Sequence, residues 1–409
     1  MSCLAQTMQV CLCKLGGTLT FADFFRSNWR PLDAAPILVT SKKPCPQTGH
    51  ERAMTVTQTS PPLQDVHVRE TIPLVSPRYL KQEENITDAA MKTVFEGREA
   101  VKKIISGGDS RVIVVLGPCS IHDQVAGLEY ARRLKALSDK VADKLLLIMR
   151  VYFEKPRTTV GWKGLINDPH LNDTFDIQTG IRIARRILLE VANMGLPAAT
   201  ELLEPITPQY IADLISLTAI GARTTESPTH RQMSSGLSMP VGFKNGTDGS
   251  LQVAIDAMLS AKSAHSFLGI DNDGQTCIVN TKGNPWGFLV LRGGRSGPNF
   301  DEKSLELATA GLTKAKLPTR LMVDCSHANS NKEYGLQSVA WNSCIAQRVA
   351  GNQNIAGLML ESNLNAGAQS LTADLSQLKY GVSITDGCIG WEETERLVLS
   401  AHEQLGGAV

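Results

Sequence analysis

The chain alternates between short apolar runs and longer amphipathic segments from about residue 85 onward, and this rhythm constrains the fold more than any other feature. The runs are rich in β-branched residues, which is typical of buried strands, whereas the segments between them have helical periodicity. The predicted strands are Val112–Leu116, Leu145–Val151, Pro197–Leu202, Ala219–Arg223, Pro240–Lys244, Phe288–Leu291, Leu321–Asp324 and Gly357–Leu360. The predicted helices lie near 124–139, 179–194, 208–217, 228–236, 249–262, 302–315, 337–350 and 391–405. Eight strands alternating with eight helices favour an α/β protein with a closed (β/α)₈ barrel, the TIM barrel.

A doubly wound open sheet is the alternative architecture. It would place a glycine-rich phosphate loop directly after the first strand. Here that strand runs instead into Gly117-Pro118-Cys119-Ser120, which does not fit such a loop.

Two segments do not belong to the barrel rhythm. The runs His265–Ile270 and Thr276–Thr281 flank an Asp-Asn-Asp-Gly turn, which predicts a β-hairpin over 264–281, inserted before the sixth barrel strand. Residues 1–60 lack sustained periodicity and are predicted to be a disordered extension. We expect an N-terminal segment over 61–105 that ends in an amphipathic helix, and a catalytic barrel over 106–409.

Bulk composition argues against several classes of partner. The net charge of +1 provides no global field that would attract nucleic acid, and no apolar run is long enough to span a bilayer. Nine cysteines in 409 residues do not form a disulfide framework, so we expect a reducing, cytoplasmic environment.

Residues with catalytic or ligand-binding chemistry follow every predicted strand. Because the carboxyl ends of barrel strands share one face, these side chains are expected to build one site. In chain order the strand-end residues are Cys119, Arg150, Glu201, Arg223, Lys244, Arg292, His327 and Glu361, with Lys155, Arg157 and Asp386 in the loops.

These residues form two chemical groups. Six cations would repel one another at one barrel mouth unless anions neutralise them, which predicts ligands that carry phosphate and carboxylate groups. They are Arg150, Lys155, Arg157, Arg223, Lys244 and Arg292. The second group is Cys119, His327, Glu361 and Asp386, a donor set that suits a first-row divalent metal. Taken singly, Cys119 is equally consistent with a packed thiol and His327 with a core histidine.

Several long stretches closely resemble a known family. They are GPCSIHD from Gly117, EKPRTTVGWKGLINDP from Glu154, GARTTES from Gly221, PVGFKNGTDG from Pro240, LRGG from Leu291, SHANS from Ser326 and SITDGCIGWE from Ser383. Over roughly 85–405 the chain resembles the type I 3-deoxy-D-arabino-heptulosonate 7-phosphate (DAHP) synthases of the fungal and enterobacterial class.

The resemblance implies a transferase that condenses phosphoenolpyruvate with erythrose 4-phosphate, in the first step of the shikimate pathway to aromatic amino acids. It also implies one divalent metal ion (Mn, Fe, Co or Zn) and a homo-oligomer, either a dimer or a tetramer. Family roles then fall on matching positions. Cys119, His327, Glu361 and Asp386 match metal ligands; Arg150, Lys155, Arg223, Lys244 and Arg292 match the phosphoenolpyruvate site; Arg157 and Thr158 match the aldose phosphate site.

Catalytic roles are expected for Lys244, Glu201, His327 and Lys155. Lys244 and Glu201 are expected to manage the protons of the reacting water, although a structural ion pair between them is the alternative. The resemblance further implies a feedback pocket for an aromatic amino acid, formed by the hairpin together with the N-terminal segment and the neighbourhood of Pro208, Gln209, Leu237 and Ser238. Phe267 and Gly269 would line it, and glycine at position 269 favours tyrosine over phenylalanine because it leaves room for the hydroxyl.

Two other functions are weighed against this one. The first is a related enzyme that condenses phosphoenolpyruvate with a different aldose, and the second is a catalytically silent sensor of an aromatic amino acid. The Lys155-Pro156-Arg157-Thr158 stretch argues against the first, and the intact metal and substrate positions argue against the second.

Overall fold

The computed structural model describes residues 63–406, except 158 and 373. The predicted disordered extension over 1–60 lies outside the described residues. The chain divides into two units, Met1–Glu70 and Thr71–Val409, and the second contains the elements discussed below.

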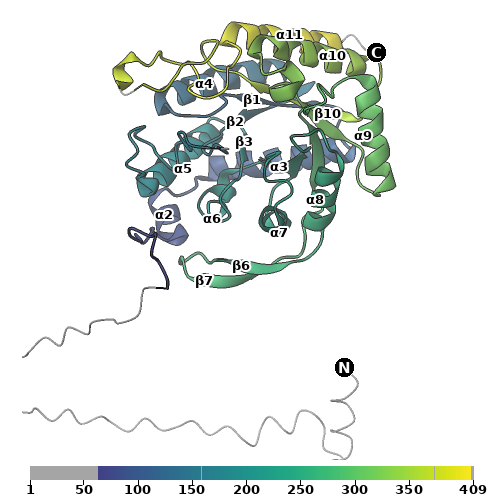
Figure 1. Cartoon of the computed structure of the whole chain (residues 1–409). Coiled ribbons are helices and arrows are strands. Elements are labelled where there is room, and N and C mark those ends of the chain that lie inside the picture. The colour runs from purple at the N-terminus through teal and green to yellow at the C-terminus, as the bar shows by residue number, and fades with distance from the viewer. Residues whose placement is uncertain (1–62, 158, 373, 407–409) are drawn as a thin grey trace, which may run out of the picture. The chain divides into compact units, whose positions relative to one another are not determined.

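Eight parallel strands close into a barrel, as the alternation predicted (Figure 1). Around the barrel the order is β1-β10-β9-β8-β5-β4-β3-β2, so the first and last strands are neighbours. In this pairing Gly117 lies opposite Glu361. The strands are β1 (Val112–Gly117), β2 (Leu145–Arg150), β3 (Ala198–Glu201), β4 (Leu217–Ile220), β5 (Val241–Lys244), β8 (Gly287–Leu291), β9 (Leu321–Asp324) and β10 (Ile355–Glu361).

Alternate residues of each strand serve two different cores. Along β1, Ile113 and Val115 belong to one buried cluster together with Phe288 and Met322 of other strands, and this cluster fills the barrel. The intervening positions of β1, beginning with Val112, belong to the larger cluster that includes the surrounding helices. Because both faces of the strands are buried, the strand sequences are continuous apolar runs rather than alternating ones.

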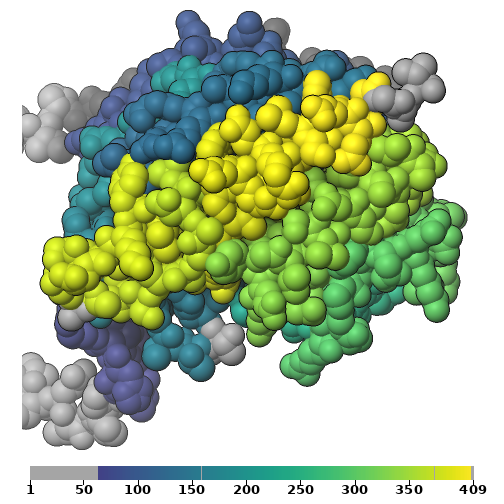
Figure 2. Space-filling model, turned by 90° about the horizontal axis from the view of Figure 1, so that it is seen from above, coloured from purple at the N-terminus to yellow at the C-terminus, as the bar shows by residue number. Residues whose placement is uncertain are grey.

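The helices form the outer layer, except that α3 (Asp88–Ser106) packs against the amino ends of the strands and closes that end of the barrel. They are α2 (Pro77–Glu83), α3 (Asp88–Ser106), α4 (Gln124–Val141), α5 (Ile177–Asn193), α7 (Pro228–Gly236), α8 (Gln252–Lys262), α9 (Glu302–Lys314), α10 (Gln337–Val349) and α11 (Trp391–Gly406). The buried face of α3 places Val101, Ile104 and Ile105 in the cluster that fills the barrel. Figure 2 shows the yellow C-terminal segment packed between the blue α4 and the green α10. Among the described helices, none combines the length and apolar character that crossing a bilayer requires.

Two predicted elements were wrong in extent. The helix expected over 208–217 is one α-helical turn, α6 (Pro208–Ile211), followed by the 3-10 turn Ala212–Leu214. It ends early because Leu217 already belongs to β4. That strand was predicted over Ala219–Arg223 but ends at Ile220, so Arg223 lies in the following turn. Gly221 ends the strand where the backbone passes so close to the Glu201 carboxylate that a side chain would collide with it.

The inserted hairpin is confirmed as antiparallel strands β6 (Ser266–Ile270) and β7 (Thr276–Asn280), which precede the sixth barrel strand. At its tip, the Arg78 guanidinium of α2 donates to Asp273 Oδ1 at 2.6 Å. Phe267 and Gly269 share the half-buried face, as the alternation predicted. The opposite face exposes an apolar cross-strand pair, Leu268 and Ile278, which are 79% and 69% exposed.

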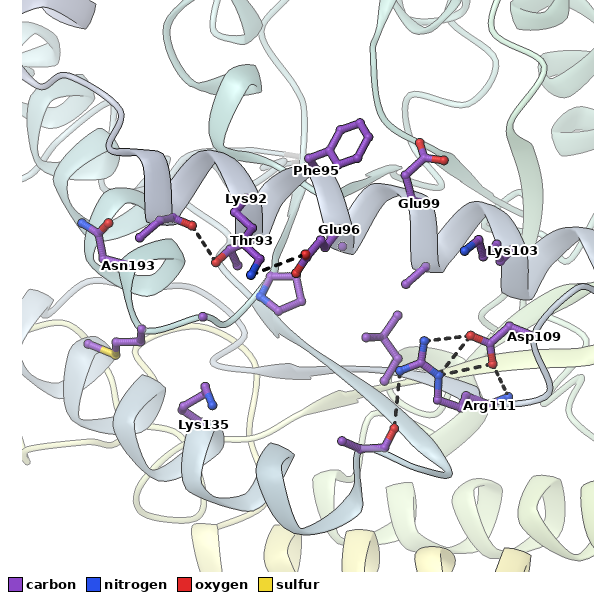
Figure 3. A pocket seen from close by; sticks show the side chains of 18 residues that line it. Lys92, Thr93, Phe95, Glu96, Glu99, Lys103, Asp109, Arg111, Lys135 and Asn193 are labelled. Atoms are coloured by element: carbon purple, nitrogen blue, oxygen red, sulfur yellow. Dashed lines mark hydrogen bonds and ion pairs between the residues drawn. The ribbon is translucent and has the colours of Figure 1, made fainter.

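A hollow of about 1070 Å³ opens between α3 and the amino ends of the strands (Figure 3). Charged side chains line it, and four of them form two ion pairs: Arg111 with Asp109 at 2.7 Å and Lys92 with Glu96 at 3.9 Å. In TIM-barrel enzymes the chemistry is found at the opposite end of the strands. The functional site is therefore expected at the carboxyl ends.

Candidate active site

The carboxyl ends of the strands surround a cavity of about 370 Å³. Its walls include residues from four of the predicted strand ends and from the loop after β10. The lining residues with predicted roles are Arg223, Arg292, His327, Glu361 and Asp386. The expectation that distant strand ends share one site is thus met for these five residues.

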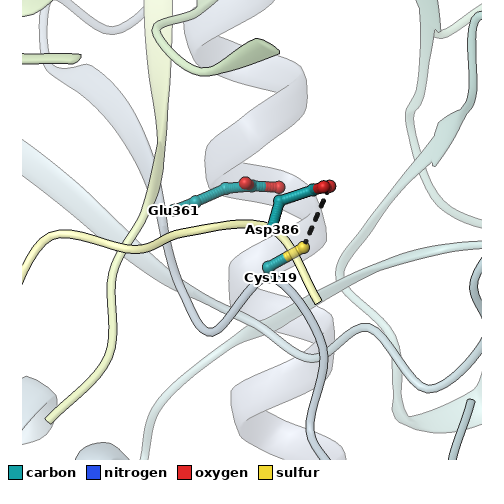
Figure 4. Close-up of side chains that lie close together, drawn as sticks. All are labelled: Cys119, Glu361 and Asp386. Atoms are coloured by element: carbon teal, nitrogen blue, oxygen red, sulfur yellow. Dashed lines mark hydrogen bonds between the residues drawn. The ribbon is translucent and has the colours of Figure 1, made fainter. Parts of the chain in front are cut away.

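A thiol and two carboxylates meet beside this cavity (Figure 4). One ligand atom each from Cys119, Glu361 and Asp386 lies within 4.8 Å of the other two. The Cys119 thiol donates to Asp386 Oδ2 at 3.5 Å. Cys119 follows β1, Glu361 ends β10 and Asp386 comes from the subsequent loop, so barrel closure brings the three together. This spacing and this mixture of sulfur and oxygen donors fit a single transition-metal ion.

His327 lines the same cavity but lies outside that close group of three. Its Nδ1 faces Asp324 Oδ2 at 3.4 Å and the Ser326 hydroxyl, which leaves Nε2 as the nitrogen available to a ligand. A carboxylate behind the ring is the usual support of a metal-binding histidine. His327 also has a left-handed backbone, with φ of 61°, a conformation that is costly for non-glycine residues and is enriched at functional sites.

Asp324 is a residue of this site that the sequence analysis did not single out. It is fully buried at the end of β9, where it accepts a hydrogen bond from Lys244 Nζ at 2.9 Å. Burial works against its charge, but Lys244 and His327 outweigh that effect and hold the pKa of the carboxyl well below its usual value. The available signal was its position: it is the only charged residue in the run Leu321–Asp324, at the carboxyl end.

The alternative of a structural Lys244–Glu201 ion pair is wrong, because Lys244 pairs with Asp324. Glu201 is buried, and its Oε1 has no hydrogen-bond partner. Lys244 remains charged, since Asp324 and other neighbours raise its pKa despite burial. Lys244 is thus a charged group paired with Asp324, whereas Glu201 keeps an oxygen without a partner.

The strand-two residues lie next to the metal-type donors. Arg150 is buried and donates through Nη2 to Glu361 Oε1 at 2.8 Å, while Lys155 Nζ donates to Cys119 Sγ at 3.0 Å. Burial, reinforced by Glu361, raises the pKa of the Cys119 thiol to about 11, and Lys155 partly offsets this. The thiol is therefore protonated near neutral pH when no cation other than these side chains is present.

Buried polar atoms without partners concentrate in this region. Of the five such side-chain atoms in the described residues, four lie here and only Gln347 Oε1 lies elsewhere. The four are Arg150 Nη1, Tyr152 Oη, Glu201 Oε1 and Arg292 Nε. Each unpaired buried group costs roughly 1–3 kcal/mol, so their clustering indicates a site prepared for a polar ligand.

Three residues predicted to bind the substrates have different positions in the structure. Arg157 is exposed, and its Nε donates to Trp162 O at 2.8 Å within its own loop rather than pointing into the cavity. Thr158 lies outside the described residues. Arg223 is exposed, lines the cavity and donates to Pro156 O at 3.2 Å, which connects it to the loop that carries Lys155 and Arg157.

The residues expected to form the feedback pocket lie in the hairpin, in α6 and directly after α7. Pro208 is buried and Gln209 half-buried in α6, and the next residue, Tyr210, donates from its hydroxyl to Val75 O at 2.7 Å. Leu237 and Ser238 follow α7, where Asn284 Nδ2 donates to Leu237 O at 3.1 Å. The structure thus places α6 against the N-terminal segment, and the end of α7 against the chain that follows the hairpin.

Comparisons with known proteins point to one family. The model of the DAHP synthetase I family matches residues 83–399. The Tyr-sensitive phospho-2-dehydro-3-deoxyheptonate aldolase of Escherichia coli K12 is 52% identical over 345 residues, which cover 84% of this chain and 97% of the relative. The Phe-sensitive aldolase of the same organism is 51% identical over 345 residues, with the same shares. The structure of the aldolase from Francisella tularensis SCHU S4 superposes with a TM-score of 0.82 at 46% identity, covering 84% of this chain and 99% of that one.

We predict that Cys119→Ser abolishes metal retention. Loss of a residue that supports a metal ligand weakens metal binding by roughly 10- to 100-fold. Loss of a direct ligand should weaken it more than that. Metal content after desalting, measured by atomic emission, tests this, and thermal melting checks that the variant is folded. Cys277→Ser, on the hairpin, is the matched control and should retain metal. A Cys119→Ser protein that keeps the metal content of the parent would remove Cys119 from the ligand set.

Proposed function

This chain belongs to the DAHP synthetase I family, and on that premise we propose that it condenses phosphoenolpyruvate with D-erythrose 4-phosphate to give DAHP and phosphate. The observation that carries the proposal is the combination at one barrel mouth of buried cationic groups with open hydrogen-bond positions and a thiol–carboxylate metal-type site. An anionic substrate and a metal-activated carbonyl are what such a site can serve together.

Phosphoenolpyruvate would occupy the cationic side of the site. Arg150, Lys155, Arg223, Lys244 and Arg292 are the residues proposed to bind its phosphate and carboxylate groups. Arg292 is half-buried, and burial lowers the pKa of its guanidinium. Anion binding would supply the missing partners of Arg150 Nη1 and Arg292 Nε and offset the mutual repulsion of the cations.

The metal site would serve the second substrate. We propose Cys119, His327, Glu361 and Asp386 as the ligands of one divalent ion, Mn, Fe, Co or Zn, that acts as a Lewis acid on the aldehyde oxygen of erythrose 4-phosphate. Lys155, whose Nζ contacts Cys119, is proposed to give a proton to that oxygen as negative charge develops on it.

The reaction joins carbon 3 of phosphoenolpyruvate to the aldehyde carbon. Water adds to carbon 2, and phosphate leaves by cleavage of its bond to that carbon, so the water oxygen becomes the keto oxygen of the product. Glu201, with its open Oε1, is proposed to accept a proton from the water, and charged Lys244 to donate one to the departing phosphate. Holding both anions in fixed orientation supplies a positioning effect in addition.

A coupled test separates this function from its alternatives. Disappearance of phosphoenolpyruvate should require erythrose 4-phosphate and should proceed far more slowly with arabinose 5-phosphate. Preference for arabinose 5-phosphate would identify a related condensing enzyme instead. Absence of turnover with either aldose in a metal-loaded, folded protein, combined with binding of an aromatic amino acid, would identify a silent sensor.

The loop from Lys155 to Pro169 is proposed to carry the aldose phosphate through Arg157 and Thr158. The Arg157 guanidinium is exposed and has hydrogen-bond donors to spare beyond the one that Trp162 O receives. An exposed guanidinium suits bidentate binding of the terminal phosphate of the aldose.

We predict that Arg157→Ala raises KM for erythrose 4-phosphate by about 10- to 100-fold, since hydrogen bonds to charged groups contribute roughly 1.5–3 kcal/mol. KM for phosphoenolpyruvate should change by less than about threefold. Steady-state kinetics with each substrate varied in turn measures both constants. Arg295→Ala, which removes another exposed arginine, is the control. Equal effects of Arg157→Ala on the two constants would contradict the assignment.

We also propose that an aromatic amino acid, tyrosine rather than phenylalanine, inhibits the enzyme from a pocket between the hairpin, α6 and the end of α7. Relatives named for sensitivity to each amino acid are almost equally similar to this chain, so overall identity does not decide between them. The local argument is space. At Gly269, a side chain would lie about 2.7 Å from Val279 Cγ2, so glycine keeps this face of the hairpin open.

The exposed pair Leu268 and Ile278 on the outer face of the hairpin supports the further proposal of a homo-dimer or homo-tetramer. An apolar cross-strand pair that is exposed to water would gain favourable burial from a subunit contact.

We propose a cytoplasmic location, because Cys119, Cys277, Cys325, Cys344 and Cys388 are free thiols.

We predict that Gly269→Ser weakens tyrosine inhibition by on the order of 10-fold, because overpacking of this kind costs about 1–3 kcal/mol. Phenylalanine, which lacks the hydroxyl, should be affected less. Inhibition constants for both amino acids, on the parent and on the variant, provide the measurement. Ser266→Gly, at an exposed position of the same strand, is the control. Stronger inhibition of the parent by phenylalanine, or an unchanged preference in the variant, would defeat the proposal.

A further inference from the structure

We infer that Tyr152, to which neither the sequence analysis nor the proposed mechanism assigns a role, is a substrate-binding residue: its hydroxyl donates a hydrogen bond to an anionic oxygen of bound phosphoenolpyruvate. The inference rests on the proposed function. It adds to the cationic site a neutral donor that a survey of charged strand-end residues does not reveal.

The first support is the position of the ring. Tyr152 lies two residues beyond Arg150, just after β2, and the Arg150 guanidinium carbon stands 3.5 Å from the centre of the Tyr152 ring. Lys244 Nζ lies 5.9 Å from the same centre. Both cations belong to the proposed phosphoenolpyruvate site, so the aromatic ring forms its floor and holds the Arg150 guanidinium by stacking.

The second support is the unpaired hydroxyl. Tyr152 is 1% exposed, and its oxygen is one of the buried side-chain atoms that have no partner in the described residues. By contrast, Tyr130 and Tyr210, which are also buried, donate to Ser362 Oγ at 2.9 Å and to Val75 O at 2.7 Å. A phenol that is buried without a partner is costly, and the cost is recovered when a ligand supplies an acceptor.

The third support is the charge around the hydroxyl. Lys244, Arg150, Glu201 and Asp324 are the charged groups that act on it. Burial is the largest influence and raises the pKa of the phenol, with Glu201 and Asp324 acting in the same direction and the two cations opposing them. The hydroxyl is thus a neutral donor at physiological pH. Arg150, whose guanidinium stacks on the same ring, keeps Nη1 open as a second donor, so both groups need acceptors that a bound anion can supply.

Water is the competing partner for this hydroxyl. An ordered water could accept the phenol proton and donate to Glu201 Oε1, the one open acceptor in the group. Binding of phosphoenolpyruvate and binding of water by this hydroxyl predict different kinetic effects. A hydroxyl that binds phosphoenolpyruvate sets the affinity for this substrate, whereas one that holds only the reacting water sets the turnover rate.

The test is Tyr152→Phe, which keeps the ring under Arg150 and removes only the hydroxyl. Binding of phosphoenolpyruvate to the manganese-loaded enzyme, measured by titration calorimetry, should weaken on the order of tenfold, as expected for loss of one hydrogen bond to an anion. KM for erythrose 4-phosphate should stay within about twofold of the parent value. Tyr152→Leu, which also removes the platform under Arg150, should weaken phosphoenolpyruvate binding further.

Tyr210→Phe is the matched control, since it removes an equally buried hydroxyl whose partner is in the N-terminal segment; its affinity for phosphoenolpyruvate should match that of the parent. Unchanged affinity in a folded Tyr152→Phe would overturn the inference, and so would a fall in kcat alone, which would assign the hydroxyl to the water. A parent protein that neither binds nor consumes phosphoenolpyruvate would instead refute the proposed function itself.

Discussion

Pairing of the first barrel strand with the last is the constraint on which the site depends. Gly117 lies opposite Glu361 in that pairing, so the turn after β1 and the end of β10 must meet at the carboxyl face. The metal-type group joins Cys119 to Glu361 and Asp386, residues more than two hundred positions apart in the chain. No local segment can form this site alone. A metal bound there would therefore favour the closed barrel, because it binds the folded state and not the separate strands.

Charge balance in the barrel mouth follows a single pattern. The two deeply buried cations each have a carboxylate partner: Arg150 pairs with Glu361, and Lys244 with Asp324. A buried charge needs such a partner, since desolvation otherwise costs several kcal/mol. A fully paired cation, however, could not bind substrate. The open positions at Arg150 Nη1 and Arg292 Nε are thus the part of the arrangement that stability does not require and that a ligand can use.

The sequence predicted the barrel, the hairpin and most strand ends because each rests on a local pattern, either a run of β-branched residues or a turn between two such runs. It misjudged α6 and β4 because residues 208–217 are apolar enough for either structure, and only packing against β3 and β5 decides where the strand begins. The partners within the site were less accessible. Asp324 and Tyr152 lie in or beside apolar runs, and Lys244, which lies near both of them, comes from another strand. The residue types at the strand ends could be predicted from the sequence. The structure was needed to show which side chains pair and which polar atoms have no hydrogen-bond partner.

The hairpin and the active site are connected by a continuous series of contacts through the described residues. Asp273 at the hairpin tip pairs with Arg78 in α2, and Val75, just before α2, accepts from Tyr210 in α6. Thr207, which precedes α6, lies with its hydroxyl 3.4 Å from Glu154 Oε1, and Glu154 is followed directly by Lys155. Glu154 is buried, which raises the pKa of its carboxyl to about 8, so this joint depends on a few hydrogen bonds rather than on an ion pair. A ligand that moved α6 would act on the base of the loop that carries Lys155. Allostery requires more than such contiguity: the ligand must favour one of two arrangements of that loop. The short, uncapped α6 is the element in this series with the least helical structure to resist such a movement.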